Sequence, residues 1–189
     1  GGVTTTSDHY FFPKSAAVGR LRAGLRCAVS GIGIGFPSAW AKNDTEYLSL
    51  SEALIQEYEG DPFVHTTIAP HAPYTVNDAA LKRCAEISDK YGVPIHMHVN
   101  ETAVEVSDSL RDHHERPIDR LERLGLLNER LLAVHSVHAS DEDITKMAAA
   151  HASVCHCPCS NLKLASGFAP IAKFLKAGII LGIGTDGAA

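Results

Sequence analysis

The chain is poor in aromatic residues, in long apolar runs and in positive charge. Its 189 residues include one tryptophan, five tyrosines and six phenylalanines. No apolar run approaches the ~20 residues that cross a bilayer. Lys and Arg number 17 against 22 Asp and Glu, which gives a formal net charge of -5. These absences argue against a membrane or nucleic-acid partner.

The cysteines also lack a recognisable framework. Five is an odd number, and their spacing is irregular, so we expect reduced thiols and a cytoplasmic protein. Cys155, Cys157 and Cys159 form a C-x-C-x-C run without the C-x₂₋₄-C turn that wraps a zinc ion. We interpret these three residues as structural thiols.

Several catalytic signatures are missing as well. The first predicted strand–helix turn carries no G-x-G-x-x-G, and neither a phosphate loop nor a G-x-S-x-G nucleophile elbow occurs. The glycine-rich run Gly31-Ile32-Gly33-Ile34-Gly35 has the wrong spacing for phosphate, and we interpret it as a flexible loop. A doubly wound nucleotide-binding sheet is therefore the less favoured architecture.

What the sequence does contain is a regular alternation of strands and helices, typical of a parallel α/β fold. The expected strands are Val3–Asp8, Leu25–Gly31, His65–Ala69, Pro94–Val99, Leu131–His135, Ser153–Cys157 and Ile179–Gly184. The expected helices are Lys14–Ala23, Thr45–Tyr58, Asp78–Tyr91, Ala103–His113, Pro117–Leu124, Asp141–Ala150 and Pro170–Ala177. Seven strands are one short of a TIM (β/α)₈ barrel, which usually runs to ~250 residues.

Metal-type ligands stand where predicted strands end. His98 closes one strand, Glu101 follows three residues later, and Asp186 comes just after the last strand. Because the carboxyl ends of parallel barrel strands meet at one rim, these side chains are expected to share a hydrolytic metal site. His96 points the same way as His98 by the two-residue period, but we interpret it as a hydrogen-bonded core residue.

Two further histidines follow predicted strands. His135 ends one of them, where it could bind metal or orient a water molecule. His71 lies between Pro70 and Pro73, which stiffen the loop; it suits substrate contact, although a structural turn would look the same. His138 lies beyond its strand, and we expect it to be exposed.

Taken together, these motifs closely resemble the amidohydrolase superfamily, and within it the 5-methylthioadenosine/S-adenosylhomocysteine deaminases. The resemblance covers essentially every residue in order. It is carried by Thr4-Thr5-Thr6-Ser7-Asp8-His9-Tyr10-Phe11-Phe12-Pro13, Pro70-His71-Ala72-Pro73-Tyr74-Thr75, His96-Met97-His98-Val99-Asn100-Glu101-Thr102, Ser160-Asn161-Leu162-Lys163-Leu164-Ala165-Ser166-Gly167 and Gly184-Thr185-Asp186-Gly187-Ala188-Ala189.

The resemblance implies a role for each site residue. His98 and Asp186 would bind one divalent metal ion, zinc first, with iron or manganese as alternatives. Glu101, His135 and Asp186 would be catalytic, while His71, Glu101 and Asp186 would contact the substrate. Glu101 would contact the purine ring and move a proton, and His135 would polarise the attacking water or the reacting centre.

The resemblance also implies a truncated barrel. Residues 1–189 would form a single amidohydrolase barrel domain holding strands two to eight. Strand one, with its His-x-His ligands, and the flanking β-sandwich would be missing. We therefore expect the chain by itself to bind metal weakly or not at all and to release no ammonia. The full-length protein is expected to be a homo-oligomer.

The implied activity is hydrolytic deamination of cyclic amidines, class EC 3.5.4. The 6-amino group of 5'-methylthioadenosine, S-adenosylhomocysteine or adenosine would leave as ammonia, giving the inosine analogue. One alternative is a deaminase or chlorohydrolase of another heterocycle, such as guanine or a triazine. The other is a non-catalytic barrel fragment.

Overall fold

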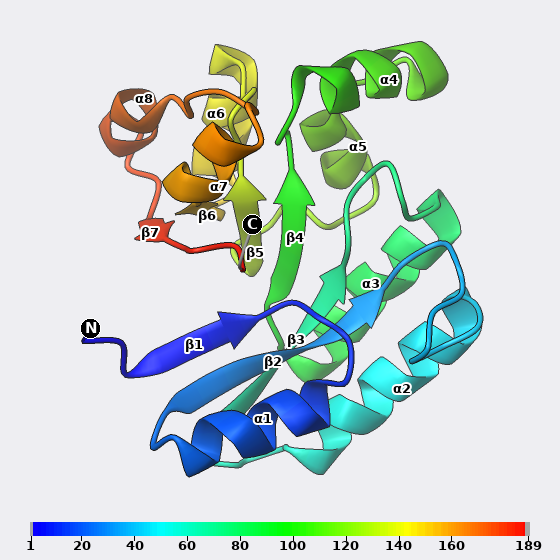
Figure 1. The fold of residues 1–189 in the computed structure, drawn as a ribbon. Helices are drawn as coiled ribbons and strands as arrows, with labels where there is room; N and C mark the ends of the chain where they lie inside the picture. The colour runs from blue at the N-terminus through cyan, green and yellow to red at the C-terminus, as the bar shows by residue number, and fades with distance from the viewer. Residues whose placement is uncertain (1, 188–189) are drawn as a thin grey trace. The chain divides into compact units, whose positions relative to one another are not determined.

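A computed structural model describes residues 2–187, which divide into two compact units. Unit 1 contains residues 2–71 and 75–96, and unit 2 contains residues 72–74 and 97–187. Each unit is an α/β arrangement of its own (Figure 1). The expectation of a single domain over residues 1–189 stays a prediction.

Unit 1 alternates strands and helices from its first element. Its elements are β1 (Thr5–Asp8), α1 (Pro13–Arg22), β2 (Arg26–Gly33), α2 (Asp44–Glu57), β3 (Val64–Pro70), α3 (Asp78–Tyr91) and the first two residues of β4 (Ile95–Val99). The strands pair in the order β1-β2-β3-β4, and all three pairs are parallel. Parallel neighbours require the helical crossovers that separate them in sequence.

The core of unit 1 lies between its strands and helices. Helices α1 and α2 both pack on β2 (Figure 1). Ala17 from α1, Val29 from β2 and Leu54 from α2 meet in one cluster and are at most 1% exposed. Because β2 is covered in this way, its sequence is almost continuously buried, as parallel strands usually are.

Unit 2 continues the same alternation. Its elements are the last three residues of β4, then α4 (Ala103–His113), α5 (Pro117–Arg123), β5 (Leu131–His135), α6 (Asp141–Ala149), β6 (Ser153–His156), α7 (Pro158–Lys163), α8 (Ile171–Lys176) and β7 (Leu181–Ile183). The strands pair in the order β4-β5-β6-β7, and the last two pairs are parallel.

Side-chain caps fix the helix starts that lead out of the strand ends. Thr102 accepts the backbone N–H of Glu105 at the start of α4, and Ser140 accepts that of Asp143 at the start of α6. Such a cap satisfies one of the four N–H groups that a helix leaves without an internal partner. The loop between each strand and its helix is thereby held to one path.

The predicted elements are confirmed with small shifts at their ends. All seven strands and all seven predicted helices are present, and two of the helices have the predicted bounds. The short helix α7 was not predicted. The prediction of a flexible loop over residues 31–35 was wrong, because β2 continues to Gly33. A Cβ at Gly31 would overlap Ser51, so glycine there allows α2 to pack closely on β2.

Over residues 2–187, none of the helices has both the length and the apolar character needed to cross a membrane.

Candidate metal centre

Three side chains of unit 2 converge at the carboxyl ends of its strands. His98 is on β4, His135 is the last residue of β5, and Asp186 lies three residues beyond β7. Each offers one ligand atom, and these atoms all lie within 4.8 Å of one another. The rings of His98 and His135 are stacked, with centroids 5.4 Å apart. The structure thus brings together the two ligands implied by the resemblance and adds His135 to them.

The chemistry of this group fits a divalent cation. Imidazole nitrogens and a carboxylate oxygen are common zinc ligands, with bonds of about 2.0–2.2 Å. A bound ion would draw the three atoms to within about 4 Å of one another, which requires only a small contraction. His98, His135 and Asp186 are therefore the residues that would hold the ion.

The backbone turns sharply where the site residues leave their strands. Asn100 after β4, His135 and Ser136 at the end of β5, and Asp186 after β7 all have φ between 48° and 72°. Residues other than glycine adopt this left-handed conformation rarely, and the strain clusters at functional sites. Here it recurs at three strand ends, each of which presents a side chain to the same group.

Glu101 lies beside the convergent group. Its Oε2 is 3.8 Å from His135 Nε2, and its Oε1 accepts a hydrogen bond from Ser166 Oγ at 3.4 Å. Asp186 Oδ2 lies 3.7 Å from the same His135 nitrogen. The two carboxylates predicted to be catalytic therefore flank one imidazole nitrogen, an arrangement suited to moving protons.

A buried carboxylate holds the backbone of Glu101 in place. Glu105, only 5% exposed, accepts the N–H of Asn100 through Oε1 and that of Glu101 through Oε2, both at 2.8 Å. Burial raises the pKa of Glu105 to about 7, although these two hydrogen bonds act in the opposite direction. The pattern Thr102-x-x-Glu105 is a capping-box signature, which predicts a bond to the N–H of Thr102 but not the bonds to the two residues before it.

Behind this turn lies an ion pair between a buried carboxylate and a half-buried guanidinium. Asp143 is fully buried and is held by Arg116, with the closest N–O distance at 2.6 Å. Asp143 also accepts the side-chain N–H of Asn100 and the backbone N–H of Ser140, while Arg116 donates to the carbonyl of His138. Since these contacts join the loops after β4 and β5, the pair supports two strand ends at once.

Helix α7 and the loop after it contribute residues that sequence reasoning missed. Ser160 donates a hydrogen bond to Asp186 Oδ2 at 2.5 Å, and Asn161 Oδ1 lies 2.8 Å from His135 Nδ1. Pro158 at the first position of α7 favours a helix start there, which is the signal that could have revealed the helix.

Two thiols, that of Cys155 on β6 and that of Cys157 just after it, lie close to Gly184, two residues before Asp186. Cys155 and Cys157 contact each other, and hydrogen bonding to Cys155 together with burial raises the pKa of the Cys157 thiol. A Cβ at Gly184 would lie 2.7 Å from Cys155 Sγ and 3.0 Å from Cys157 Sγ. Both cysteines are free, in accord with the predicted reduced thiols.

The prediction that His138 is exposed is wrong. It is only partly exposed, and its Nε2 lies 2.8 Å from the carbonyl oxygen of Ser166. The loop after β5 folds back far enough to make this contact, which the sequence period could not reveal.

His71 lies in unit 1, directly after β3. Its Nδ1 is 2.9 Å from Thr75 Oγ1, and its ring meets that of His9 edge-on. His9 also meets His96 at a centroid distance of 4.9 Å, and His96 Nδ1 lies 3.2 Å from Ser7 Oγ. His96 is 7% exposed, which fits a hydrogen-bonded core residue. The substrate role of His71 stays a prediction.

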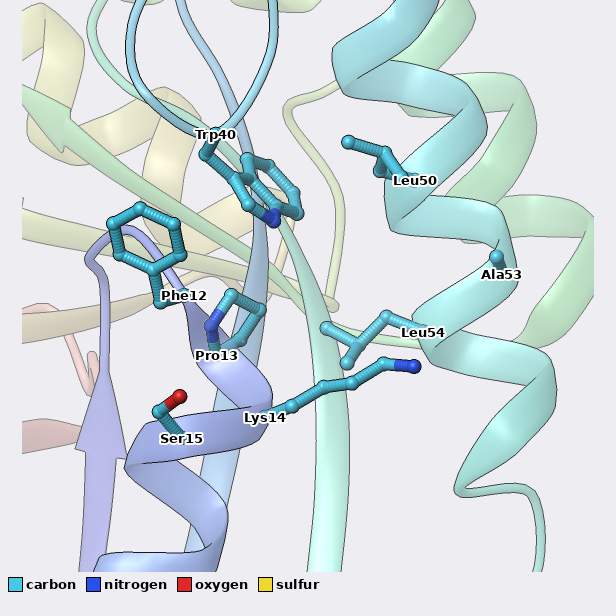
Figure 2. A pocket seen from close by; sticks show the side chains of 8 residues that line it. All are labelled: Phe12, Pro13, Lys14, Ser15, Trp40, Leu50, Ala53 and Leu54. Atoms are coloured by element: carbon cyan, nitrogen blue, oxygen red, sulfur yellow. The ribbon is translucent and has the colours of Figure 1, made fainter.

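Unit 1 also holds a pocket of about 290 Å³ between α1 and α2 (Figure 2). Its lining residues are Phe12, Pro13, Lys14, Ser15, Trp40, Leu50, Ala53 and Leu54. The lining is mainly apolar, and its one charged residue, Lys14, forms an ion pair with Glu57. This pocket contains none of the titratable groups of the metal centre, so we assign no chemistry to it.

Comparison with known proteins identifies the class of fold and site. Residues 1–189 match the Amidohydrolase family, and the chain belongs to that family. A solved adenosine deaminase from Xanthomonas campestris, with bound zinc, is 45% identical with a TM-score of 0.96, over 99% of this chain and 43% of that one. The similarity confirms the predicted fold class, an incomplete (β/α)₈ barrel of the amidohydrolase type.

Individual relatives show which members of this family the chain is similar to. The chain is 40% identical over 188 residues to a 5-methylthioadenosine/S-adenosylhomocysteine deaminase of Thermodesulfovibrio yellowstonii, covering 100% of this chain and 43% of that protein. It is 37% identical over 187 residues to a 5'-deoxyadenosine deaminase of Methanothrix thermoacetophila, covering 99% and 44%. The chain thus spans less than half the length of these relatives. The predicted resemblance to this deaminase family is confirmed.

Proposed function

We propose that this chain carries most of the active site of a metal-dependent hydrolytic deaminase. Its substrates would be adenosine thioethers and related nucleosides, namely 5'-methylthioadenosine, S-adenosylhomocysteine and adenosine, with release of ammonia. The observation that supports this proposal most is the convergence of His98, His135 and Asp186 beside Glu101. The relatives named as deaminases of such nucleosides support the substrate class.

A divalent ion, zinc first, when bound by His98, His135 and Asp186 would lower the pKa of water toward ~7 and so supply a nucleophile at neutral pH. Asp186 would accept a proton from the attacking water, and Ser160 holds the carboxylate in place by donating to Oδ2. His135 would serve as a ligand through Nε2, the nitrogen that faces both carboxylates.

Glu101 has the role of general acid. It protonates a ring nitrogen of the purine, which makes C6 electrophilic. The proton that Asp186 took from water then passes to the amino group, which leaves as ammonia. The remaining proton of the added hydroxyl returns to Glu101, which leaves the 6-oxo product. Ser166 and Glu105 keep its side chain and backbone in position. The resemblance assigns His71 to substrate contact, and an effect on KM in a His71→Asn variant tests that assignment.

The decisive experiment uses the full-length enzyme and measures ammonia release. The panel contains 5'-methylthioadenosine, S-adenosylhomocysteine, adenosine, guanine and a chlorinated triazine, compared by kcat/KM because pocket contacts set that ratio. We expect the adenosine compounds to be preferred. Preference for guanine or the triazine would show that the proposed substrate class is wrong. No turnover of any compound would favour a non-catalytic protein.

The Glu101→Gln variant tests the mechanism. Loss of a general acid should lower turnover by about 10²-fold or more. Glu142→Gln is the matched control, because that side chain is 74% exposed and belongs to an outer ion pair. Turnover of Glu101→Gln within a few-fold of the parent enzyme would remove Glu101 from this role.

A further inference from the structure

One seven-residue segment contacts three of the four residues of the metal centre and its flanking acid. Ser160 and Asn161 are on α7, and Ser166 is in the loop that follows it. They contact Asp186, His135 and Glu101, in that order. All three are at most 7% exposed, although none is apolar. A buried polar side chain is stable only with a hydrogen-bond partner, so these contacts account for the burial.

The contact between Asn161 and His135 indicates which ring nitrogen of His135 carries a proton. An amide oxygen only accepts hydrogen bonds, so the 2.8 Å contact between Asn161 Oδ1 and His135 Nδ1 requires a proton on that nitrogen. A neutral imidazole has one N–H, so Nε2 then carries the lone pair. Nε2 is the nitrogen that lies 3.8 Å from Glu101 and 3.7 Å from Asp186.

The backbone of Asn161 fixes the direction of its side chain. Its N–H donates to the carbonyl of Cys157 at 2.9 Å, and its carbonyl accepts the N–H of Ser166 at 2.8 Å. Both main-chain groups are therefore satisfied within α7 and its loop, and the residue is 1% exposed. With little freedom left, the side chain holds its amide against the His135 ring.

We propose that Asn161 is the positioning residue that holds His135 in the Nδ1–H tautomer and presents the Nε2 lone pair to the cation site. This proposal rests on the proposed function, because it assigns a purpose to that lone pair. The opposite tautomer would place an N–H at Nε2, which could neither bind a cation nor accept a proton from water.

Asn161 has a second feature that makes the proposal testable. Among the described residues, its Nδ2 has no hydrogen-bond partner. If the amide were reversed, Nδ2 would donate to His135 Nδ1 and the ring proton would move to Nε2. The two orientations therefore predict opposite tautomers of the same ring, and a measurement of the tautomer distinguishes them.

The test is solid-state ¹⁵N NMR of the intact enzyme, labelled at histidine and stripped of metal by a chelator. Spectra are recorded at pH about 8.5, above the ordinary histidine pKa of about 6.5, so that the rings are neutral. The His135 signals are identified by their loss in a His135→Asn variant. We expect a protonated Nδ1 and an unprotonated Nε2. A proton on Nε2 in the parent enzyme would overturn the proposal.

Two variants show whether Asn161 is responsible. Asn161→Asp keeps an acceptor and should retain the Nδ1–H signal, whereas Asn161→Leu removes it and should shift the population toward Nε2–H. An unchanged tautomer in Asn161→Leu would also overturn the proposal. If that variant does not fold, the tautomers of the parent enzyme and of Asn161→Asp still decide the question.

Zinc affinity provides a second readout. Loss of a partner that orients a metal-binding histidine typically weakens metal binding by about 10–100-fold. We expect such a loss in Asn161→Leu and near-parental affinity in Asn161→Asp. Because the tautomer is measured without metal or substrate, failure of the deaminase proposal would leave that result intact. If the enzyme is an active deaminase but His135 carries its proton on Nε2, the proposed function stands and the positioning role of Asn161 is wrong.

Discussion

The carboxylate of Glu105 accepts the backbone N–H of Glu101 at 2.8 Å, four residues earlier in the chain. The contact ties the residue proposed as general acid to the first turn of α4. Since its other oxygen accepts the N–H of Asn100, Glu105 fixes both residues of the turn after β4. The position of Glu101 thus depends on a group that takes no part in the chemistry.

The stability of the fold should depend on the protonation of Glu105. Burial raises the pKa of Glu105 from its ordinary value of 4.5 to about 7. Between these values the folded chain keeps a proton that the unfolded chain releases. The stability from this group is therefore fully present below pH 4.5 and is lost as the pH rises through 7.

We expect the free energy of unfolding of the parent, relative to Glu105→Gln, to fall by about 2–3 kcal/mol as the pH rises from 5 to 8. Urea denaturation at several pH values measures this difference. Glu142→Gln, at an exposed position, serves as the control and should show no such trend. A difference between parent and Glu105→Gln that does not change with pH would contradict the prediction.

The Arg116–Asp143 ion pair should be important for stability. Asp143 is fully buried, so Arg116→Leu leaves a carboxylate without its compensating charge. We expect a loss of about 3–5 kcal/mol in urea denaturation. Arg111→Leu is the control, because its ion pairs are exposed and its removal should leave stability unchanged. Equal effects of the two substitutions would show that burial of Asp143 does not decide the outcome.

Gly184 should not tolerate a side chain. A Cβ there would meet the thiols of Cys155 and Cys157 at 3.0 Å or less, so Gly184→Ala forces β7 or β6 to move. We expect a loss of about 1–3 kcal/mol in unfolding free energy, typical of overpacking, together with weaker zinc binding through Asp186.

Gly182→Ala, on β7 two residues before Gly184, is the matched control. Its Cβ would lie 3.9 Å from the carbonyl of Val154, an ordinary contact, and the variant should behave like the parent. Adding Cys155→Ala to Gly184→Ala should restore part of the stability by removing the nearer thiol. If the double variant recovers no unfolding free energy, the clash with Cys155 is not the cause of the loss.

Zinc binding tests the convergent group directly. Titration calorimetry of the 189-residue chain should show weak zinc binding. His98→Asn and Asp186→Asn should each reduce the zinc affinity by more than about 100-fold. This is more than the usual effect of losing a residue that only orients a metal ligand. His151→Asn is the control, because His151 is exposed and lies outside the group. Unchanged binding in Asp186→Asn would show that zinc binds at another site.

The sequence was sufficient to predict the strands and which side chains stand near their carboxyl ends. Alternating apolar segments with caps and turn residues specify a parallel α/β fold, because parallel strands need helical crossovers. His98 and Asp186 could be placed together from sequence alone, since one lies near the end of a strand, the other follows a strand, and the carboxyl ends of these strands share one edge. The family motifs then supplied the roles of Glu101 and His135.

Other features depended on contacts between distant segments. Helix α7 has only six residues, too few for a clear helical period, and it was therefore missed. Buried Asp143 and its half-buried partner Arg116 are 27 positions apart and resemble ordinary surface charges in the sequence.

By itself, the sequence determined which residue types stand at the strand ends, because the two-residue and 3.6-residue periods are local properties of the chain. Only the tertiary structure decided which imidazole nitrogen of His135 faces the carboxylates. That choice depends on a hydrogen bond to Asn161, 26 residues away, and a bond of this kind forms only once β5 and α7 have packed together.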